Sequence, residues 1–140
     1  MAAALRHLRY TVKKSLALLI KDYYIITERT RREDSEVFCI TLNPSCAVYE
    51  GHFPDMPVSP GVCNIQMLLE CAELVAGKPL RISSINRCRL TTLITPETHP
   101  RLEAHITLTD NTDHLLLNAS LGMGDDVYML LSARLLPIDE

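Results

Sequence analysis

The sequence has no Cys-x-x-Cys pair, no apolar run long enough to span a membrane and no strong net charge. Its five cysteines occur singly inside apolar runs. We therefore expect small buried hydrophobic residues in a reducing compartment, and neither a zinc site nor another metal site. The net charge of −3 argues against nucleic-acid binding, and the missing membrane span argues against an integral membrane protein. These absences together predict a cytoplasmic globular protein.

The composition predicts one folded domain over residues 1–140. Apolar residues make up 47% and charged residues 22%, which is typical of a globular chain. The apolar run Ser15–Ile20 follows basic residues, but it is shorter than a signal-peptide core and no cleavage site follows it. We predict instead that residues 1–20 form an amphipathic helical extension of the domain.

After residue 20, short segments of alternating apolar and polar residues are separated by polar turns, a pattern typical of an antiparallel sheet. The predicted strands are Asp22–Thr30, Glu36–Leu42, Arg81–Ile94, Leu102–Leu108, Leu115–Leu121 and Val127–Leu136. The exception is Val62–Ala76, where apolar residues follow helical spacing and occupy the other faces too. Such a helix must be buried nearly all round. The sequence thus predicts an α+β fold, with an antiparallel sheet wrapped around one long central helix.

The segment Gly51–Glu73 reads GHFPDMPVSPGVCNIQMLLECAE and carries the clearest functional pattern. Three prolines stiffen the loop that follows His52, because each proline fixes its φ angle. The last of them, Pro60, and then Gly61 leave no bulky side chain over the first free N–H groups of the helix. A stiff loop that brings a histidine to a bare helix N-terminus indicates a binding or catalytic site.

Residues His52–Val62 resemble the signature of the FabZ and FabA type hydroxyacyl-(acyl carrier protein) dehydratases, H-F-P-x-x-P-x-x-P-G-V. The resemblance implies the hotdog fold, in agreement with the helix and sheet predicted from periodicity. It also implies a (3R)-hydroxyacyl-[acyl carrier protein] dehydratase, a lyase of fatty-acid or polyketide-type biosynthesis. The family implies a homodimer, or a multiple of dimers, with the site at the interface. No cofactor is implied, since the acyl substrate arrives on a phosphopantetheine arm.

Dehydration of a 3-hydroxyacyl thioester needs a base for the C2 proton, an acid for the leaving hydroxyl and donors for the thioester carbonyl. The resemblance assigns the base to His52, whose tautomer the backbone carbonyl of Val58 would hold. It assigns the carbonyl-binding N–H to Gly61, where the helix dipole favours negative charge. The signature residues that we assign to substrate binding are Phe53, Pro60 and Val62.

The chain departs from the family pattern at the acid. Fourteen residues after His52, where the family carries Glu or Asp, stands Gln66, which cannot release a proton at neutral pH. Glu70 lies one turn further along the same helical face. Three interpretations stay open: Glu70 supplies the acid, the site only binds acyl groups, or this subunit pairs with an active homologue in a hotdog heteromer. A hotdog thioesterase is a further alternative, although those enzymes lack the H-F-P-x-x-P loop.

A partner surface is predicted on the strand after the helix. Arg87 and Arg89 alternate onto one face of this strand, where the family carries Lys or Arg near the mouth of its acyl tunnel. Acyl carrier proteins are acidic, so a basic pair is the complementary feature. We therefore predict that these two arginines contact an acyl carrier protein.

Overall fold

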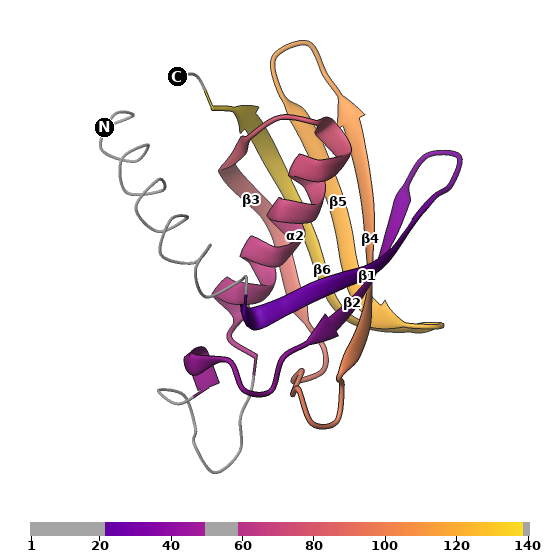
Figure 1. Cartoon of the computed structure of the whole chain (residues 1–140). Helices are drawn as coiled ribbons and strands as arrows, with labels where there is room; N and C mark the ends of the chain where they lie inside the picture. The colour runs from indigo at the N-terminus through magenta and orange to yellow at the C-terminus, as the bar shows by residue number, and fades with distance from the viewer. Residues whose placement is uncertain (1–21, 50–58, 139–140) are drawn as a thin grey trace.

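The computed structural model describes residues 22–49 and 59–138. Six antiparallel strands form one sheet in the order β1-β2-β4-β5-β6-β3, and the sheet curves around the long helix α2 (Figure 1). The elements are β1 (Tyr24–Arg31), β2 (Glu36–Leu42), the 3-10 helix η1 (Ala47–Tyr49), α2 (Gly61–Ala76), β3 (Leu80–Leu90), β4 (Arg101–Asp110), β5 (Leu115–Met123) and β6 (Asp126–Pro137). The predicted α+β hotdog architecture is confirmed, while the helix predicted over residues 1–20 lies outside the described residues.

The core lies between α2 and the sheet. On β4 every second residue, Leu102, Ala104 and Ile106, is buried, and the residues between them are partly exposed. This alternation follows from the two-residue period of a strand. The helix presents buried residues on more than one side, as its apolar sequence predicts. The helix residues that belong to the core are Cys63, Met67, Leu68, Leu69, Cys71 and Ala72.

Strand β3 is an edge of the sheet, although it follows α2 directly in the chain. The prediction that this strand runs to Ile94 is wrong. The N–H of Thr91 donates to the carbonyl of Tyr128 at 2.8 Å, and the Thr91 hydroxyl donates to the carbonyl of Val127 at 2.9 Å. The ladder ends with Leu90 opposite Met129, Thr91 is still bonded to β6 by these contacts, and the chain then leaves the sheet.

The C-terminal end of α2 is fixed to both edge strands. Gly77 ends the helix in the left-handed region, with φ 72°, and a carboxylate of Glu73 accepts the N–H of Leu80 at 2.8 Å. On the other side, Arg29 of β1 donates to the carbonyl of Leu74 at 3.2 Å. The site helix is therefore held between β3 and β1.

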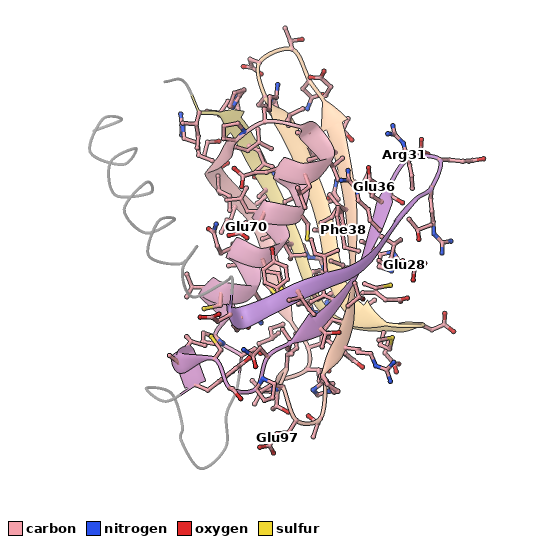
Figure 2. All side chains as sticks on the ribbon, in the orientation of Figure 1. Glu28, Arg31, Glu36, Phe38, Glu70 and Glu97 are labelled. Carbon is pink, nitrogen blue, oxygen red and sulfur yellow. The ribbon has the colours of Figure 1, made fainter. Side chains whose placement is uncertain are left out.

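Arg29 also joins the two strands of the first hairpin. Its guanidinium forms a two-pronged ion pair with Glu36, which holds the pKa of the Glu36 carboxyl below its usual value. The same guanidinium lies over the ring of Phe38, 5.2 Å from the ring centroid. Glu36 and Phe38 both project from β2 (Figure 2). Because the Glu36 side chain is nearly buried, this pair is less screened by water than an ordinary surface pair.

The cysteines follow the prediction only in part. All five thiols are free; Cys46, Cys63 and Cys71 are buried, and burial raises the pKa of the Cys71 thiol to about 12. Cys88, however, is exposed, because the outer half of edge strand β3 is not covered by α2. In the described ranges, no helix combines the length and apolar character needed to cross a membrane.

Candidate functional site

The helix start is arranged as the sequence predicts. Pro60 precedes α2 in an extended conformation, with φ −64° and ψ 139°, and no side chain of the described residues caps the helix start. The Pro60 carbonyl accepts the N–H groups of Cys63 at 3.0 Å and Asn64 at 3.1 Å. The N–H groups of Gly61 and Val62 are then the ones for which an α-helix provides no internal acceptor. They point outward at the positive end of the helix dipole, which favours a carbonyl oxygen or an anion.

Gly61 meets no side chain of the described residues on its Cα. Within residues 22–49 and 59–138, a Cβ atom built at Gly61 would meet no atom within 4 Å, and the glycines with positive φ are Gly77 and Gly124. Neither the packing of these residues nor the backbone conformation therefore requires glycine at position 61. The neighbouring Val62 is 61% exposed. An uncovered apolar residue beside two outward N–H groups suits an acyl thioester, which is apolar except at its carbonyl.

Buried tyrosines hold both sides of the helix start. The Ser59 N–H donates to the carbonyl of Ile94 at 2.7 Å, and the Ser59 hydroxyl lies 3.1 Å from that of Tyr49. Tyr49 stacks on Tyr23, with ring centroids 6.0 Å apart, and Tyr23 donates to Oδ1 of the fully buried Asn64 at 2.7 Å. Burial raises the pKa of Tyr23, so its phenol remains a neutral donor. The first turn of α2 is thus fixed from residue 59 to residue 64.

The structure brings Gln66 and Glu70 into direct contact. The Nε2 atom of Gln66 donates to Oε2 of Glu70 at 3.0 Å, and the Tyr24 hydroxyl donates to Oε1 of Glu70 at 3.0 Å. Gln66 is only 8% exposed, and Glu70 is half-buried in the middle of α2 (Figure 2). The two oxygens of the Glu70 carboxylate each accept a hydrogen bond, which is the arrangement of an ionised acceptor.

This arrangement leaves the described helix without a good proton donor. Glu70 accepts from both neighbours, and Gln66 lies between it and the first turn. Burial, together with the charge of Glu70, raises the pKa of Tyr24, so that phenol is a weaker acid than a free tyrosine. The interpretation in which Glu70 supplies the acid therefore finds no support in the contacts of Glu70.

Three of the predicted site residues, His52, Phe53 and Val58, lie outside the described residues. Their roles as base, substrate contact and tautomer-holding carbonyl stay predictions. The described site residues do meet at one place in the fold: Pro60, Gly61 and Val62 at the start of α2, with Gln66 on the following turn.

Comparisons with known proteins identify the family of this chain. A family model for ApeI-like proteins, described as ApeI dehydratase, matches residues 28–120. This chain belongs to the ApeI-like dehydratase family. A FabZ 3-hydroxyacyl-[acyl-carrier-protein] dehydratase from Caulobacter sp. (strain K31) is 30% identical over 78 residues, which cover 49% of this chain and 47% of the relative. The match thus spans about half the length of that curated relative.

Solved structures show the same fold at low sequence identity. The dehydratase heterocomplex ApeI:P from Xenorhabdus doucetiae matches with a TM-score of 0.65 at 21% identity, over 80% of this chain and 96% of that chain. An uncharacterised protein from Erwinia carotovora subsp. atroseptica matches with a TM-score of 0.59 at 20% identity, over 83% and 95% of the two chains. These likenesses establish the hotdog fold of the ApeI-like chain.

The predicted arginine pair lies on the outer part of edge strand β3. Arg87 is opposite Ser132 and Arg89 is opposite Leu130 in the β3–β6 ladder, so both side chains lie on the same face. Both residues are exposed. The pair is therefore accessible to a partner, and its role in binding an acyl carrier protein stays a prediction.

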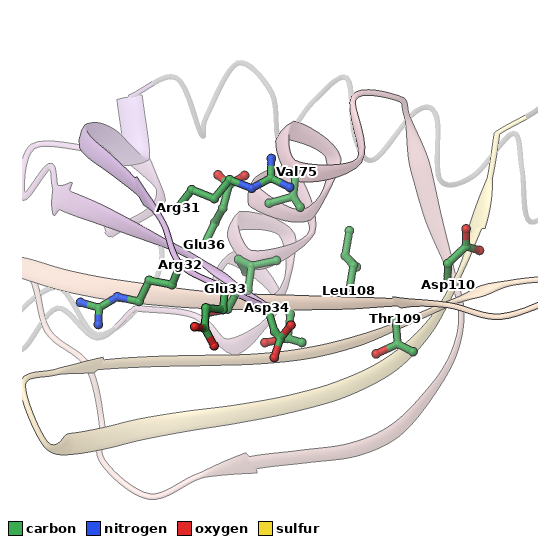
Figure 3. A pocket seen from close by; sticks show the side chains of 12 residues that line it. Arg31, Arg32, Glu33, Asp34, Glu36, Val75, Leu108, Thr109 and Asp110 are labelled. Carbon is green, nitrogen blue, oxygen red and sulfur yellow. The ribbon is translucent and has the colours of Figure 1, made fainter.

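A cleft of about 600 Å³ lies at the opposite end of α2 from the predicted site. It is formed by the β1–β2 turn, Val75 of α2 and the end of β4 (Figure 3). Side chains of both charges line it, among them Arg31, Glu33 and Asp110. Because positive and negative groups are mixed along its walls, the cleft indicates no ligand class.

The contacts of the tyrosines that bind α2 are not predicted by the sequence pattern. The segment Asp22–Thr30 is rich in tyrosine, which indicates a strand, but periodicity does not identify the contacts of a strand residue. The Tyr23–Asn64 and Tyr24–Glu70 hydrogen bonds join residues 41 and 46 positions apart. One signal was available: a polar Asn64 and a Glu70 on a helix buried nearly all round require buried partners.

Proposed function

We propose that this chain is a subunit of a 3-hydroxyacyl-thioester dehydratase that provides the base and the carbonyl-binding helix N-terminus, but no acid of its own. The acid comes from a second hotdog subunit that carries Glu or Asp at the position of Gln66. The reaction belongs to fatty-acid or polyketide-type biosynthesis, with the acyl chain delivered by an acyl carrier protein. The observation that carries this proposal is the Gln66–Glu70 hydrogen bond, which commits Glu70 as an acceptor.

The chemistry divides between two subunits as follows. His52 takes the C2 proton, and the N–H of Gly61 binds the thioester oxygen on which negative charge develops. The hydroxyl group leaves only when a nearby acid gives it a proton. In hotdog dehydratases the histidine and the acid come from opposite subunits, so His52 meets the partner's acid and not Gln66 of its own chain.

An uncovered apolar surface next to the helix start supports a partner subunit. Ile85 and Leu90 lie on the helix-facing side of β3, opposite the buried Ala133 and Met129, yet both are exposed. Val62 at the start of α2 is also exposed. Exposed apolar residues that gather at an open strand edge are typical of an interface. The structural relative ApeI:P is itself a dehydratase heterocomplex, which favours a second, different hotdog subunit.

Complementation between two variants of this chain tests the proposal and does not require the natural partner. The wild-type chain has the base without the acid, and the variant His52→Ala/Gln66→Glu has the acid without the base. We expect crotonyl-CoA hydration to be near background in each protein alone, and to appear when the two are co-expressed. Mixed dimers then contain one complete site. His52→Ala co-expressed with the wild type is the matched control, since it provides no acid.

Two results would overturn the proposal. Full hydration by the wild-type chain alone would mean that its own residues include an acid. If mixed dimers form but the co-expressed pair shows no hydration, acyl binding would be the remaining function of this chain. Release of free thiol from acyl-CoA would indicate a thioesterase instead.

A further inference from the structure

A chain of hydrogen bonds joins edge strand β1 to the site helix. The Tyr24 hydroxyl donates to Oε1 of Glu70, and Gln66 donates through Nε2 to Oε2 of the same carboxylate, each at 3.0 Å. Tyr24 is 8% exposed, and its ring packs edge-on against Tyr23 at a centroid distance of 6.5 Å. The phenol therefore has a fixed position from which it holds the carboxylate.

The carboxylate determines which way the Gln66 amide faces. An ionised carboxylate only accepts hydrogen bonds, so the nitrogen of the amide, and not its oxygen, must face Glu70. The amide is planar, and its oxygen then lies on the edge turned away from Glu70. A family glutamic acid at this position would present a donor, whereas Gln66 held this way presents an acceptor.

We propose that Tyr24 is a positioning residue which, through Glu70, turns the oxygen of Gln66 toward the acyl site, where it accepts a hydrogen bond from the hydroxyl of a 3-hydroxyacyl chain. The inference rests on the function proposed above, in which each site is shared between two subunits, so that Gln66 faces the acyl chain bound at the helix start of the opposite subunit. It adds a substrate preference: the site of this chain distinguishes a 3-hydroxyacyl thioester from the same thioester without the hydroxyl. It gives Gln66 a role in binding that needs no proton transfer.

Two isosteric variants separate positioning from general stability. Tyr24→Phe removes the part-buried bond to Glu70, and Tyr23→Phe removes the buried bond of the neighbouring tyrosine to Asn64. Both variants keep their ring packing, so both should fold. The probes are 3-hydroxybutyryl-CoA and butyryl-CoA, whose dissociation constants are measured by calorimetry on the purified wild-type chain and on each variant.

We expect the wild type to bind the hydroxylated probe about 3- to 10-fold more tightly, as one neutral hydrogen bond allows. Tyr24→Phe should reduce this ratio to about one, and Tyr23→Phe should leave it unchanged even if it lowers both affinities. Glu70→Gln, which leaves Tyr24 in place but lets the Gln66 amide turn either way, should also lose the preference. This second variant keeps the test valid if Tyr24→Phe does not fold.

The outcomes separate this inference from the proposed function. A preference that survives in Tyr24→Phe and Glu70→Gln overturns the positioning role, while the dehydratase proposal stands. Equal loss in Tyr23→Phe and Tyr24→Phe also overturns it, because the effect would then be one of stability. If the wild-type chain binds neither thioester, both proposals fail.

Discussion

Gln66 and Glu70 are one helical turn apart and share a hydrogen bond in which the amide donates and the carboxylate accepts. The FabZ and FabA type family that the chain resembles runs Glu-x-x-x-Gln on this helix, so the order of the two residues is reversed here. The amide at the position of the family's acid leads to the first prediction.

Gln66→Glu should raise dehydration by one or more orders of magnitude, since a missing general acid costs about 10²- to 10⁴-fold in rate. The new carboxyl would lie beside Glu70, and two adjacent carboxylates do not both ionise readily. Because Tyr24 still donates to Glu70, the proton should reside on the introduced group. Hydration of crotonyl-CoA measures the rate.

The double variant Gln66→Glu/Glu70→Gln is the sharper form of this experiment, because it restores the family order and keeps the pair hydrogen-bonded. It should be at least as active as Gln66→Glu, and Glu70→Gln alone should show no gain. If Glu70→Gln abolished an existing activity and Gln66→Glu lowered it, Glu70 would be the working acid.

Gly61→Ala should lower acyl-thioester affinity while leaving the fold intact. The added methyl group meets no atom of the described residues within 4 Å, but it lies beside the outward N–H groups. Gly122→Ala is the contrasting variant, because its Cβ would lie 2.0 Å from the Asp126 carbonyl oxygen and must displace the β5–β6 turn. We expect a loss of about 2 kcal/mol or more in the free energy of unfolding for Gly122→Ala and little change for Gly61→Ala. Urea denaturation and thioester binding measure the two effects.

Arg29→Ala should destabilise the fold by about 1–2 kcal/mol, because it leaves the nearly buried Glu36 and the Leu74 carbonyl without this donor. Arg32→Ala, at an exposed arginine of the adjoining turn, serves as the control.

The Arg29–Glu36 pair also predicts that the stability of the fold depends on pH. Arg29 lowers the pKa of Glu36 from its usual 4.5, so the unfolded chain binds the proton more readily than the folded chain. The stabilisation is present above pH 4.5 and is lost as the pH falls through the lowered folded pKa. The free energy of unfolding, measured by urea denaturation at several pH values in this acidic range, should fall less steeply with decreasing pH in Arg29→Ala than in the wild type. An equal dependence on pH in both proteins would contradict the prediction.

The charge reversal Arg87→Glu/Arg89→Glu should weaken binding of an acyl carrier protein by about tenfold or more at low salt, and the difference should shrink as salt is added. Arg101→Glu, at an exposed arginine at the start of β4, is compared with each single reversal, Arg87→Glu and Arg89→Glu, because each of the three changes the net charge equally. Titration by fluorescence anisotropy at two ionic strengths measures these variants. Equal weakening by Arg101→Glu would indicate a general charge effect and not a docking site.

The purified chain alone should be a dimer or a multiple of one, with a mass about twice the 15.7 kDa of the single chain or higher. The exposed Ile85 and Leu90 on β3 supply the physical reason, since association removes apolar surface from water. Light scattering at micromolar concentration is the direct measurement. A mass of one chain would remove the basis for a site shared between subunits.

The periodicity of the sequence predicts the helix and the six strands well, because burial on one face imposes a period of two or of 3.6. It does not predict where β3 ends, since that depends on Thr91 meeting Val127 and Tyr128 far along the chain. The order of strands in the sheet is equally non-local, and it explains why Cys88 is exposed on an edge.

The site was predictable where a local motif defines it and not where distant residues complete it. Gly61 and Gln66 could be placed from the H-F-P-x-x-P-x-x-P-G-V pattern and the helical repeat. Tyr24, which donates a hydrogen bond to Glu70, lies on β1, and β1 and β3 are the opposite edges of the sheet. No spacing rule relates such residues, because they meet only after the sheet has curved around the helix.

The bond between the Glu73 carboxylate and the Leu80 N–H has a mechanical consequence. Glu73 lies on the site helix, and Leu80 is the first residue of the strand whose open edge carries the exposed apolar residues. A displacement of that edge on docking of another subunit would therefore reach α2 through this hydrogen bond as well as through the chain between residues 73 and 80. Association would then change the relative positions of the reacting groups as well as bring them together. A different partner subunit would alter the geometry of the site without any change in the residues of this chain.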